Sequence, residues 1–357
     1  MDLANKIHVV TEAGLPLMIY GDPGIGKTYV VYDYGRHFNL PTKCIIASLY
    51  ESESFIGVPY VSNEQVKYSD PELFVDFKNK NKGILFFDEI NTCSKRIQNI
   101  LLRIILEKVA GNLKLHPNIK VIAAGNYTNV EGNIQMNLAL ANRFVNIFEK
   151  ENPELWSAGI VSGFKAPTFI RIAKDWREKW LPHYSSLISE YIRCNPTSLK
   201  VMPTEFEDIT KMAAWPSPRT WEYAIKILAI THDMDIKMSE RKELLTSTVG
   251  PAFVHEVFQF IKERDLHSID KIDPSNIVIP KNPDNARLFL KMLVFHSDNP
   301  KYSDLCIKAF KVAFDSGYQP LVMDNAKAVA KQLSTHMSSN NILKSLTFLR
   351  DVIRYIS

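Results

Sequence analysis

The glycine-rich segment near the start of the chain constrains its fold more than any other feature. A short apolar run at 17–20 leads into Gly21-Asp22-Pro23-Gly24-Ile25-Gly26-Lys27-Thr28, and a helical stretch follows as far as Phe38. This order predicts a buried strand, a tight turn and a helix. Glycines in such a turn let successive backbone N–H groups point inward, and the helix N-terminus adds positive potential. The segment therefore predicts a phosphate-binding loop.

The pattern GxxxxGK[ST] gives two side chains of this loop separate roles. Lys27 can reach the β- and γ-phosphates of a nucleotide, and the Thr28 hydroxyl can ligate Mg²⁺. A glycine-rich turn with an exposed lysine is the plain structural alternative. The dinucleotide pattern GxGxxG is not completed after Gly24 and Gly26. We expect nucleotide contacts from Gly21, Asp22, Pro23, Gly24, Ile25, Gly26, Lys27, Thr28 and Tyr29.

An acidic pair and an asparagine follow two further apolar runs. Asp88 and Glu89 come directly after the run 84–87, and Asn126 comes after 121–125. Ligands of open α/β sheets bind at the carboxyl ends of strands. Asp88 would hold Mg²⁺ through its water shell, and Glu89 would orient and polarise the attacking water. Asn126 would bridge this water and the γ-phosphate. The structural alternatives are a charge pair at a helix N-terminus for Asp88 and Glu89, and a turn-forming residue for Asn126.

Strands alternate with helices only in the first part of the chain, which predicts a parallel α/β sheet there. Beyond residue 150 the strand signals vanish, and the segment 273–283 is rich in proline. These changes predict an α/β nucleotide-binding core at 1–150, a helical domain at 151–273 and a helical extension at 274–357. The expected strands are 17–20, 43–47, 83–87, 120–124 and 145–148; the expected helices include 97–105, 168–193, 219–231, 252–263 and three segments after 300, the last with Ile342, Leu346, Leu349, Ile353 and Ile356 on one face.

A series of motifs follows a fixed order over residues 15–230. The motifs are the glycine-rich loop, Phe86-Phe87-Asp88-Glu89-Ile90-Asn91, Gln98, Leu101-Leu102, Glu107-Lys108-Val109, Ala123-Ala124-Gly125-Asn126, Ala141-Asn142-Arg143-Phe144 and Ser217-Pro218-Arg219. Their order and spacing resemble the AAA+ ATPases of the MoxR branch. The resemblance implies a P-loop NTPase core with a parallel five-stranded sheet of order 5-1-4-3-2, helices on both faces and an all-α lid. Residues 249–274 more loosely resemble MoxR-type ATPases found beside a von Willebrand A-like or metallopeptidase-like partner protein.

The resemblance also implies roles for three polar residues. It makes Asn126 sensor 1, Arg143 the arginine finger that reaches the γ-phosphate of a neighbouring subunit, and Arg219 sensor 2. A plain alternative for Arg143 is a cation that complements a helix dipole. Arg219 falls in the first turn of a helix expected to begin at Ser217 and Pro218, where a cation is disfavoured unless an anion faces it. Asn142 stands where the family often has aspartate.

The activity implied by the resemblance is ATP hydrolysis with Mg²⁺ by a homo-oligomeric ring, expected to be a hexamer, that remodels a protein partner in a chaperone-like way. One alternative is a slow, nucleotide-gated binding module that assembles with a partner. Another is a nucleic-acid-linked or GTP-using AAA+ subunit. Two insertions typical of the branch are expected as hairpins, at 59–68 and 109–115.

The amino-acid composition limits the classes of partner that we expect for this chain. The chain has 43 Lys and Arg against 39 Asp and Glu, and this excess of +4 over 357 residues marks no strongly basic surface for nucleic acid. The mixture of basic residues with Trp176 and Trp180 could bind nucleic acid or form an ordinary amphipathic helix. Four widely spaced cysteines form no CxxC pair, and no apolar run approaches the length of a membrane span. We expect a cytoplasmic protein without membrane contact.

Overall fold

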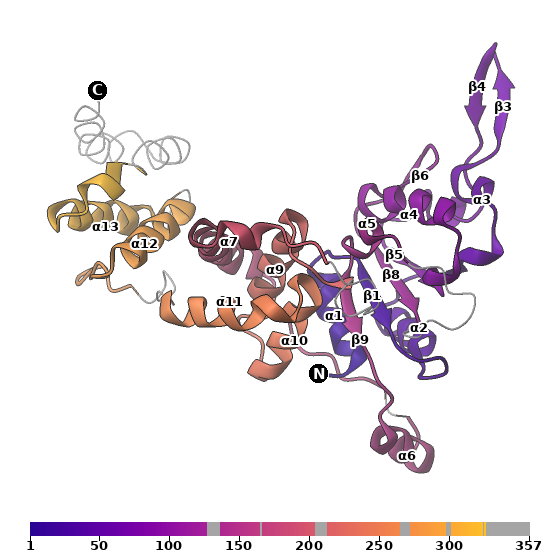
Figure 1. Cartoon of the computed structure of the whole chain (residues 1–357), viewed down its shortest axis with the longest axis horizontal. Coiled ribbons are helices and arrows are strands. Elements are labelled where there is room, and N and C mark those ends of the chain that lie inside the picture. The colour runs from indigo at the N-terminus through magenta and orange to yellow at the C-terminus, as the bar shows by residue number, and fades with distance from the viewer. Residues whose placement is uncertain are drawn as a thin grey trace. The chain divides into compact units, whose positions relative to one another are not determined.

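The computed structural model describes residues 1–126, 136–164, 166–203, 213–264, 272–297, 301–323 and 325, and it divides the chain into two compact units (Figure 1). Unit 1 comprises 1–174 and 197–254, and unit 2 comprises 175–196 and 255–357. The last expected helix, which carries Ile342 to Ile356, lies outside the described residues. No helix in the described part of the chain is long and apolar enough to cross a membrane.

Unit 1 is built on a five-stranded sheet in which every neighbouring pair is parallel. The strand order is β2-β5-β8-β1-β9, which becomes 5-1-4-3-2 in reverse when these strands are numbered along the chain. This confirms the predicted core. The inner strands β1, β5 and β8 are mostly apolar and buried, as central parallel strands covered on both faces should be, whereas the edge strand β2 is mostly half-buried. Their bounds are β1 Leu17–Tyr20, β2 Thr42–Ile46, β5 Gly83–Asp88, β8 Ile119–Gly125 and β9 Val145–Phe148.

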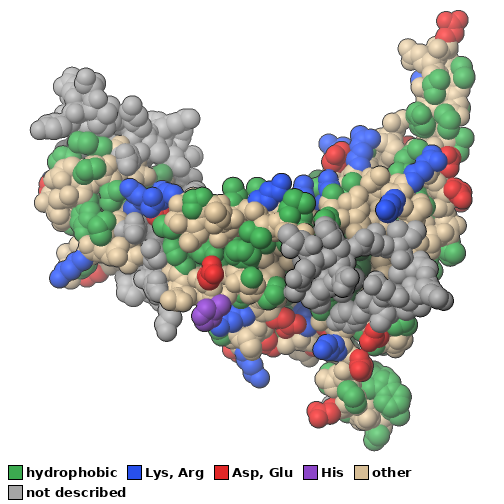
Figure 2. Space-filling view, in the orientation of Figure 1, with side chains coloured by type: hydrophobic (Ala, Val, Ile, Leu, Met, Phe, Trp, Pro, Cys, Tyr) green, Lys and Arg blue, Asp and Glu red, His purple; other side chains and the backbone are tan. Residues whose placement is uncertain are grey.

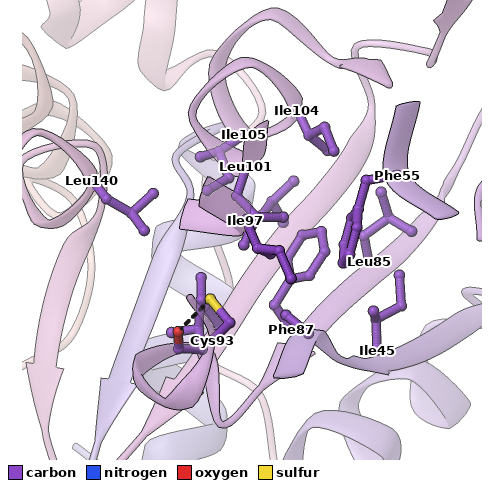
Figure 3. Close-up of a cluster of buried hydrophobic side chains, with 14 of the residues drawn as sticks. Ile45, Phe55, Leu85, Phe87, Cys93, Ile97, Leu101, Ile104, Ile105 and Leu140 are labelled. Atoms are coloured by element: carbon purple, nitrogen blue, oxygen red, sulfur yellow. Dashed lines mark hydrogen bonds between the residues drawn. The ribbon is translucent and has the colours of Figure 1, made fainter. Parts of the chain in front are cut away.

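The helix α4, Lys95–Glu107, buries the predicted apolar stripe against this sheet. Ser94 caps its N-terminus by accepting a hydrogen bond from the backbone of Ile97. Figure 3 shows Ile97 and Leu101 beside the β5 side chains Leu85 and Phe87. The other helices with bounds inside unit 1 are α1 Leu3–Glu12, α2 Lys27–His37, α3 Ser52–Ile56, α5 Leu138–Ala141, α6 Pro153–Ser162, α9 Pro218–Ile230 and α10 Met238–Val249, with short 3₁₀ turns at η1 Ala47–Leu49, η2 Val75–Phe77 and η3 Ile90–Thr92.

Both predicted hairpins are confirmed. β3 Pro59–Ser62 pairs antiparallel with β4 Gln65–Tyr68, and β6 Val109–Ala110 pairs with β7 Leu113–Lys114. The β3–β4 hairpin projects from unit 1, as Figure 1 shows, and its side chains are almost all exposed.

The prediction of one helix over 168–193 is wrong for its first eight residues, since α7 spans Trp176–Cys194. Tertiary contacts hold the preceding segment outside a helix. The side chain of Asn5 donates to the carbonyl of Thr168 at 3.0 Å and accepts from the backbone N–H of Ile170 at 2.8 Å. Phe169 packs edge-on against His8 and Phe38. These contacts compete with helix formation, and the helical pattern alone did not reveal them.

Unit 2 has a helical core of its own. α12 Pro283–His296 and α13 Ser303–Asp315 pack their apolar faces together, and α11, Pro251–Arg264, runs from unit 1 into unit 2. In α7, Trp176 and Trp180 are buried, and the guanidinium of Arg177 lies 4.4 Å from the ring centre of Trp176. The amphipathic-helix interpretation of this aromatic and basic mixture is therefore the correct one. A short 3₁₀ turn, η4 Pro196–Leu199, follows α7.

We expect Lys108→Met to stabilise the protein at neutral pH. Lys108 ends α4 in the left-handed region, at φ 56°, and its half-buried amine makes no ion pair within the described residues. Burial, together with the nearby Lys120 charge, lowers its pKa from 10.5 to about 8. The folded state therefore binds fewer protons than the unfolded state between about pH 8 and 10.5, and stability contributed by this group rises with pH there.

Replacing the amine removes the cost of burying a charge, which we place at roughly 1–2 kcal/mol at pH 7. Urea unfolding at pH 7 and at pH 10 measures the gain, which should shrink at the higher pH. Lys114→Met, at an exposed lysine of the following hairpin, is the matched control and should change little. Equal effects of the two substitutions at pH 7 would contradict the prediction.

Candidate functional site

The glycine-rich loop takes the backbone shape that phosphate binding needs. Gly24 and Gly26 have φ values of 82° and 91°, in the left-handed region that favours glycine. A Cβ added at Gly21 would lie 2.9 Å from the carbonyl oxygen of Glu149, so only glycine fits there. Gly26 is the N-cap of α2 and offers no side-chain cap. The first N–H groups of this helix are therefore available to an anion.

The side chain of Lys27 joins this loop to the end of another strand. Its amine donates to the carbonyls of Gly21 at 2.8 Å and Asp22 at 2.9 Å, and to Oδ1 of Asn126 at 3.2 Å. β1 and β8 are adjacent and parallel, so the loop after β1 and Asn126 after β8 lie at one edge of the sheet. The structure thus brings together Lys27 and Asn126, which are 99 residues apart in the chain.

The predicted metal ligands also meet at this edge. Thr28 lies in the first turn of α2 and Asp88 ends β5, and the Thr28 hydroxyl donates to Oδ2 of Asp88 at 2.6 Å. A hydroxyl and a carboxylate are oxygen ligands of the kind that Mg²⁺ prefers. No group of three His, Cys, Asp or Glu side chains that could hold a metal alone occurs within the described residues. The pair therefore fits a cation that takes its remaining ligands from phosphates and water.

Carboxylates surround the Lys27 amine without contacting it directly. Burial lowers the pKa of Lys27, and the negative charges of Asp88, Asp22 and Glu89 oppose this shift.

Glu89 is held by its backbone while its carboxylate stays exposed. Its φ of 50° is unusual for a residue other than glycine, and its carbonyl accepts from both the backbone and the hydroxyl of Thr92, at 2.9 and 2.8 Å. Its N–H donates to Oδ1 of Asp88 at 3.0 Å. The carboxylate has no hydrogen-bond partner in the described part of the chain. Sequence reasoning missed Thr92, whose contact fixes the turn that presents Glu89.

Arg143 lies at the opposite end of the sheet from the phosphate loop. β9 runs parallel to β1, with Leu17 beside Val145 and Tyr20 beside Phe148. The carboxyl end of β9 is thus next to the loop, whereas Arg143 precedes the start of the strand. The four residues of β9, Val145–Phe148, span about 13 Å at roughly 3.3 Å per residue. Arg143 and the phosphate loop of the same chain are therefore separated by at least the length of this strand.

Arg219 lies beside Arg143 and not beside Lys27. Arg219 donates to Oδ1 of Asn142 at 3.4 Å, and Arg143 donates to the carbonyl of Ala139 at 2.7 Å. Burial lowers the pKa of Arg143, and the positive charge of Arg219 lowers it further. Neither arginine forms an ion pair with a carboxylate among the described residues, and Nε of Arg143 is buried without a hydrogen-bond partner there. Two neighbouring cations that form no direct ion pair in the described part of the chain favour binding of an external anion, although the charge of Glu107 acts on Arg143.

Asn142 connects the two arginine-bearing segments. Its Oδ1 accepts from the hydroxyl of Ser217 at 2.9 Å, and its amide donates to the carbonyl of Trp215 at 3.3 Å. Ser217 caps α9 by accepting from the backbone N–H of Thr220, and Pro218 is the first helical residue, as predicted. The asparagine that departs from the family pattern thus ties the start of α9 to the end of α5.

One family model matches part of the chain. Residues 16–144 match the family model of the AAA domain, dynein-related subfamily. A comparison with curated proteins found no match. Among solved structures, a candidate ATPase from Cytophaga hutchinsonii is 17% identical with a TM-score of 0.42, over 72% of this chain and 87% of that one. A full-length MCM homolog from Methanopyrus kandleri is 11% identical with a TM-score of 0.35, over 72% of this chain and 53% of that one.

Proposed function

We propose that this chain, whose core is that of an AAA+ P-loop NTPase, hydrolyses ATP with Mg²⁺ at a site shared between two copies of the chain. The observation that carries the proposal is the meeting of Thr28 with Asp88 at 2.6 Å and of Lys27 with Asn126 at 3.2 Å. Four residues from three distant segments converge on the N-terminus of one helix.

Each group has a task in the hydrolysis. The loop from Gly21 to Tyr29 and the N-terminus of α2 would bind the phosphate chain, and Lys27 would exchange its bonds to loop carbonyls for bonds to phosphate oxygens. Thr28 and Asp88 would hold Mg²⁺, which supplies charge neutralisation on the phosphates when bound. Glu89 would orient and polarise the attacking water, and Asn126 would help to position it.

Arg143 and Arg219 would complete the site of a neighbouring copy. Arg143 precedes β9, whose other end lies beside the loop of the same chain, and Arg219 lies close to Arg143; this placement favours a second copy as the source of the anion. Such a head-to-tail contact between identical chains closes into a ring when the rotation permits. The resemblance to MoxR-branch ATPases favours a hexamer, in which residues 151–273 act as the lid and 274–357 as an extension.

Exposed apolar side chains support assembly and a protein partner. Figure 2 shows hydrophobic groups gathered on α6 and on the β3–β4 hairpin. On the hairpin Val61 is 76% exposed, and on α6 Val161 is 87% exposed and Trp156 is also exposed. Contiguous apolar surface of this kind marks interaction sites. We propose that it serves ring contacts and the remodelling of a protein client, which includes the von Willebrand A-like or metallopeptidase-like partner as a candidate.

The slow, nucleotide-gated binding module remains the second candidate, because the same surfaces suit partner capture without rapid turnover. Binding of nucleic acid through stacking on Trp176 or Trp180 is disfavoured, because both side chains are buried.

Nucleotide binding and ATP turnover of Lys27→Ala test the proposal. We expect binding to weaken strongly and turnover to fall by at least about 100-fold, because the phosphates lose their cation. Lys80→Ala, at an exposed lysine outside the site, is the control. Thermal unfolding verifies that the variant still folds, since Lys27 also ties the loop to Asn126. Unchanged turnover in Lys27→Ala would exclude the mechanism, and turnover of GTP above that of ATP would favour the GTP-using alternative.

A further inference from the structure

We propose that Asn91 is a positioning residue that holds Asn126 in place beside Lys27, and that Gly125 is a glycine because Asn91 needs the space. The inference rests on the proposed ATP hydrolysis and adds a residue to it. It makes the turn that presents Glu89 and the strand end that presents Asn126 one connected unit.

The turn that carries Asn91 is held at several points. Besides the two bonds from Thr92 to the carbonyl of Glu89, the buried Cys93 thiol donates to the carbonyl of Ile90 at 3.0 Å, drawn as the dashed line in Figure 3. Gln98 on α4 donates to the carbonyl of Cys93 at 3.3 Å. Asn91 therefore starts from a backbone of defined position, two residues after Glu89.

From this turn the Asn91 side chain reaches across to the end of β8. Its amide Nδ2 donates to the backbone carbonyl of Asn126 at 3.3 Å, and only 5% of the residue is exposed. Oδ1 of the same Asn126 accepts from the Lys27 amine. Asn126 is thus held from two sides, at its backbone by Asn91 and at its side chain by Lys27. Loss of either contact frees the amide that would face the γ-phosphate.

Gly125 provides the space that Asn91 occupies. A Cβ added at Gly125 would lie 2.6 Å from Oδ1 and 3.1 Å from Cγ of Asn91, and 2.8 Å from Cε of Met18. The methionine tip is flexible and can move at small cost. Asn91 cannot move in the same way without breaking its bond to Asn126. The glycine at the end of β8 is therefore matched to the asparagine.

The arrangement has a stability cost that a purely structural role does not explain. Oδ1 of Asn91 is buried and has no hydrogen-bond partner in the described part of the chain. An unsatisfied buried acceptor costs about 1–3 kcal/mol. An apolar residue at this position would avoid the cost but would not hold the carbonyl of Asn126. Retention of the amide next to the nucleotide site points to a role in positioning.

Steady-state kinetics and nucleotide binding of Asn91→Ala test the inference. We expect kcat for ATP to fall about 10- to 100-fold, because the groups of the site lose their alignment. The Kd for nucleotide should stay within about threefold, since the phosphate loop is untouched. The Tm should change little, because removal of the orphan acceptor offsets the lost bond to the carbonyl of Asn126. A merely structural role would lower the Tm and leave kcat of the folded fraction unchanged.

The variant Gly125→Ala is a second test of the inference. Alone, it should lower kcat as Asn91→Ala does, because its Cβ displaces the asparagine. In the Asn91→Ala background it should add little, and in a Met18→Leu background its defect should persist. Additive losses from Asn91→Ala and Gly125→Ala, or unchanged kcat in Asn91→Ala, overturn the inference while leaving the proposed function intact. Wild-type protein without turnover overturns both.

Discussion

A one-to-one mixture of the Lys27→Ala and Arg143→Ala proteins is expected to hydrolyse ATP although neither protein does so alone. Lys27 and Arg143 lie at opposite ends of the sheet, so each variant lacks one half of every shared site. In a mixture, sites formed by the loop of an Arg143→Ala copy and the arginines of a Lys27→Ala copy are intact. Random head-to-tail assembly makes about a quarter of the sites intact.

Arg143→Ala alone should lower turnover by about 10³-fold or more, since arginine fingers contribute on the order of 10³ to 10⁵. ATP turnover of the pure and mixed proteins, measured above the assembly concentration, checks the recovery. Arg103→Ala is the matched control, because Arg103 is an exposed arginine that pairs with Glu107 on the same helix. A mixture as inactive as its components would contradict the shared site.

The variant Arg219→Ala tests whether Arg219 and Arg143 act on the same site. Because Arg219 and Arg143 lie side by side, Arg219→Ala should recover activity when mixed with Lys27→Ala but not when mixed with Arg143→Ala. In the latter mixture no copy presents both arginines to its neighbour. Recovery there would mean that the two arginines act on different sites.

Glu89→Gln is expected to abolish turnover while ATP binding persists. The exposed carboxylate makes no hydrogen bond within the described residues, and glutamine keeps its shape, so stability should change by less than about 0.5 kcal/mol. Loss of the group that polarises water should lower kcat by about 10²- to 10⁴-fold.

The variant Asp88→Asn provides a comparison for Glu89→Gln, because the two adjacent carboxylates have different proposed roles. Asp88 contacts Thr28 and would hold the metal, so its substitution should weaken Mg²⁺-dependent ATP binding itself. Titration of a fluorescent ATP analogue with and without Mg²⁺ distinguishes the two variants. Normal turnover in Glu89→Gln, or equal loss of binding in both, would contradict the assigned roles. The same Glu89→Gln protein, loaded with ATP, is suited to capture of a client.

The core of the fold and half of the site follow from local sequence patterns. Short, mostly apolar runs of strand length predicted all five core strands, and Ser217 with Pro218 predicted the start of α9. The loop residues and Asp88 lie at strand ends, where the parallel arrangement alone brings them together. Periodicity, caps and strand ends are properties of neighbouring residues, so one sequence is enough to read them.

Tertiary structure alone decided where distant segments meet. The pairing of Arg219 with Asn142, 77 residues away, and of Asn91 with Gly125 depends on side-chain packing that no local pattern encodes. The segment before α7 was predicted helical. Its contact with Asn5 on α1 joins residues 163 apart in the chain, so no local pattern could reveal it. The sequence by itself determined the nucleotide loop and the strands beside it. Only packing brought Arg143 and Arg219 together, because these contacts form between segments that are far apart in the chain.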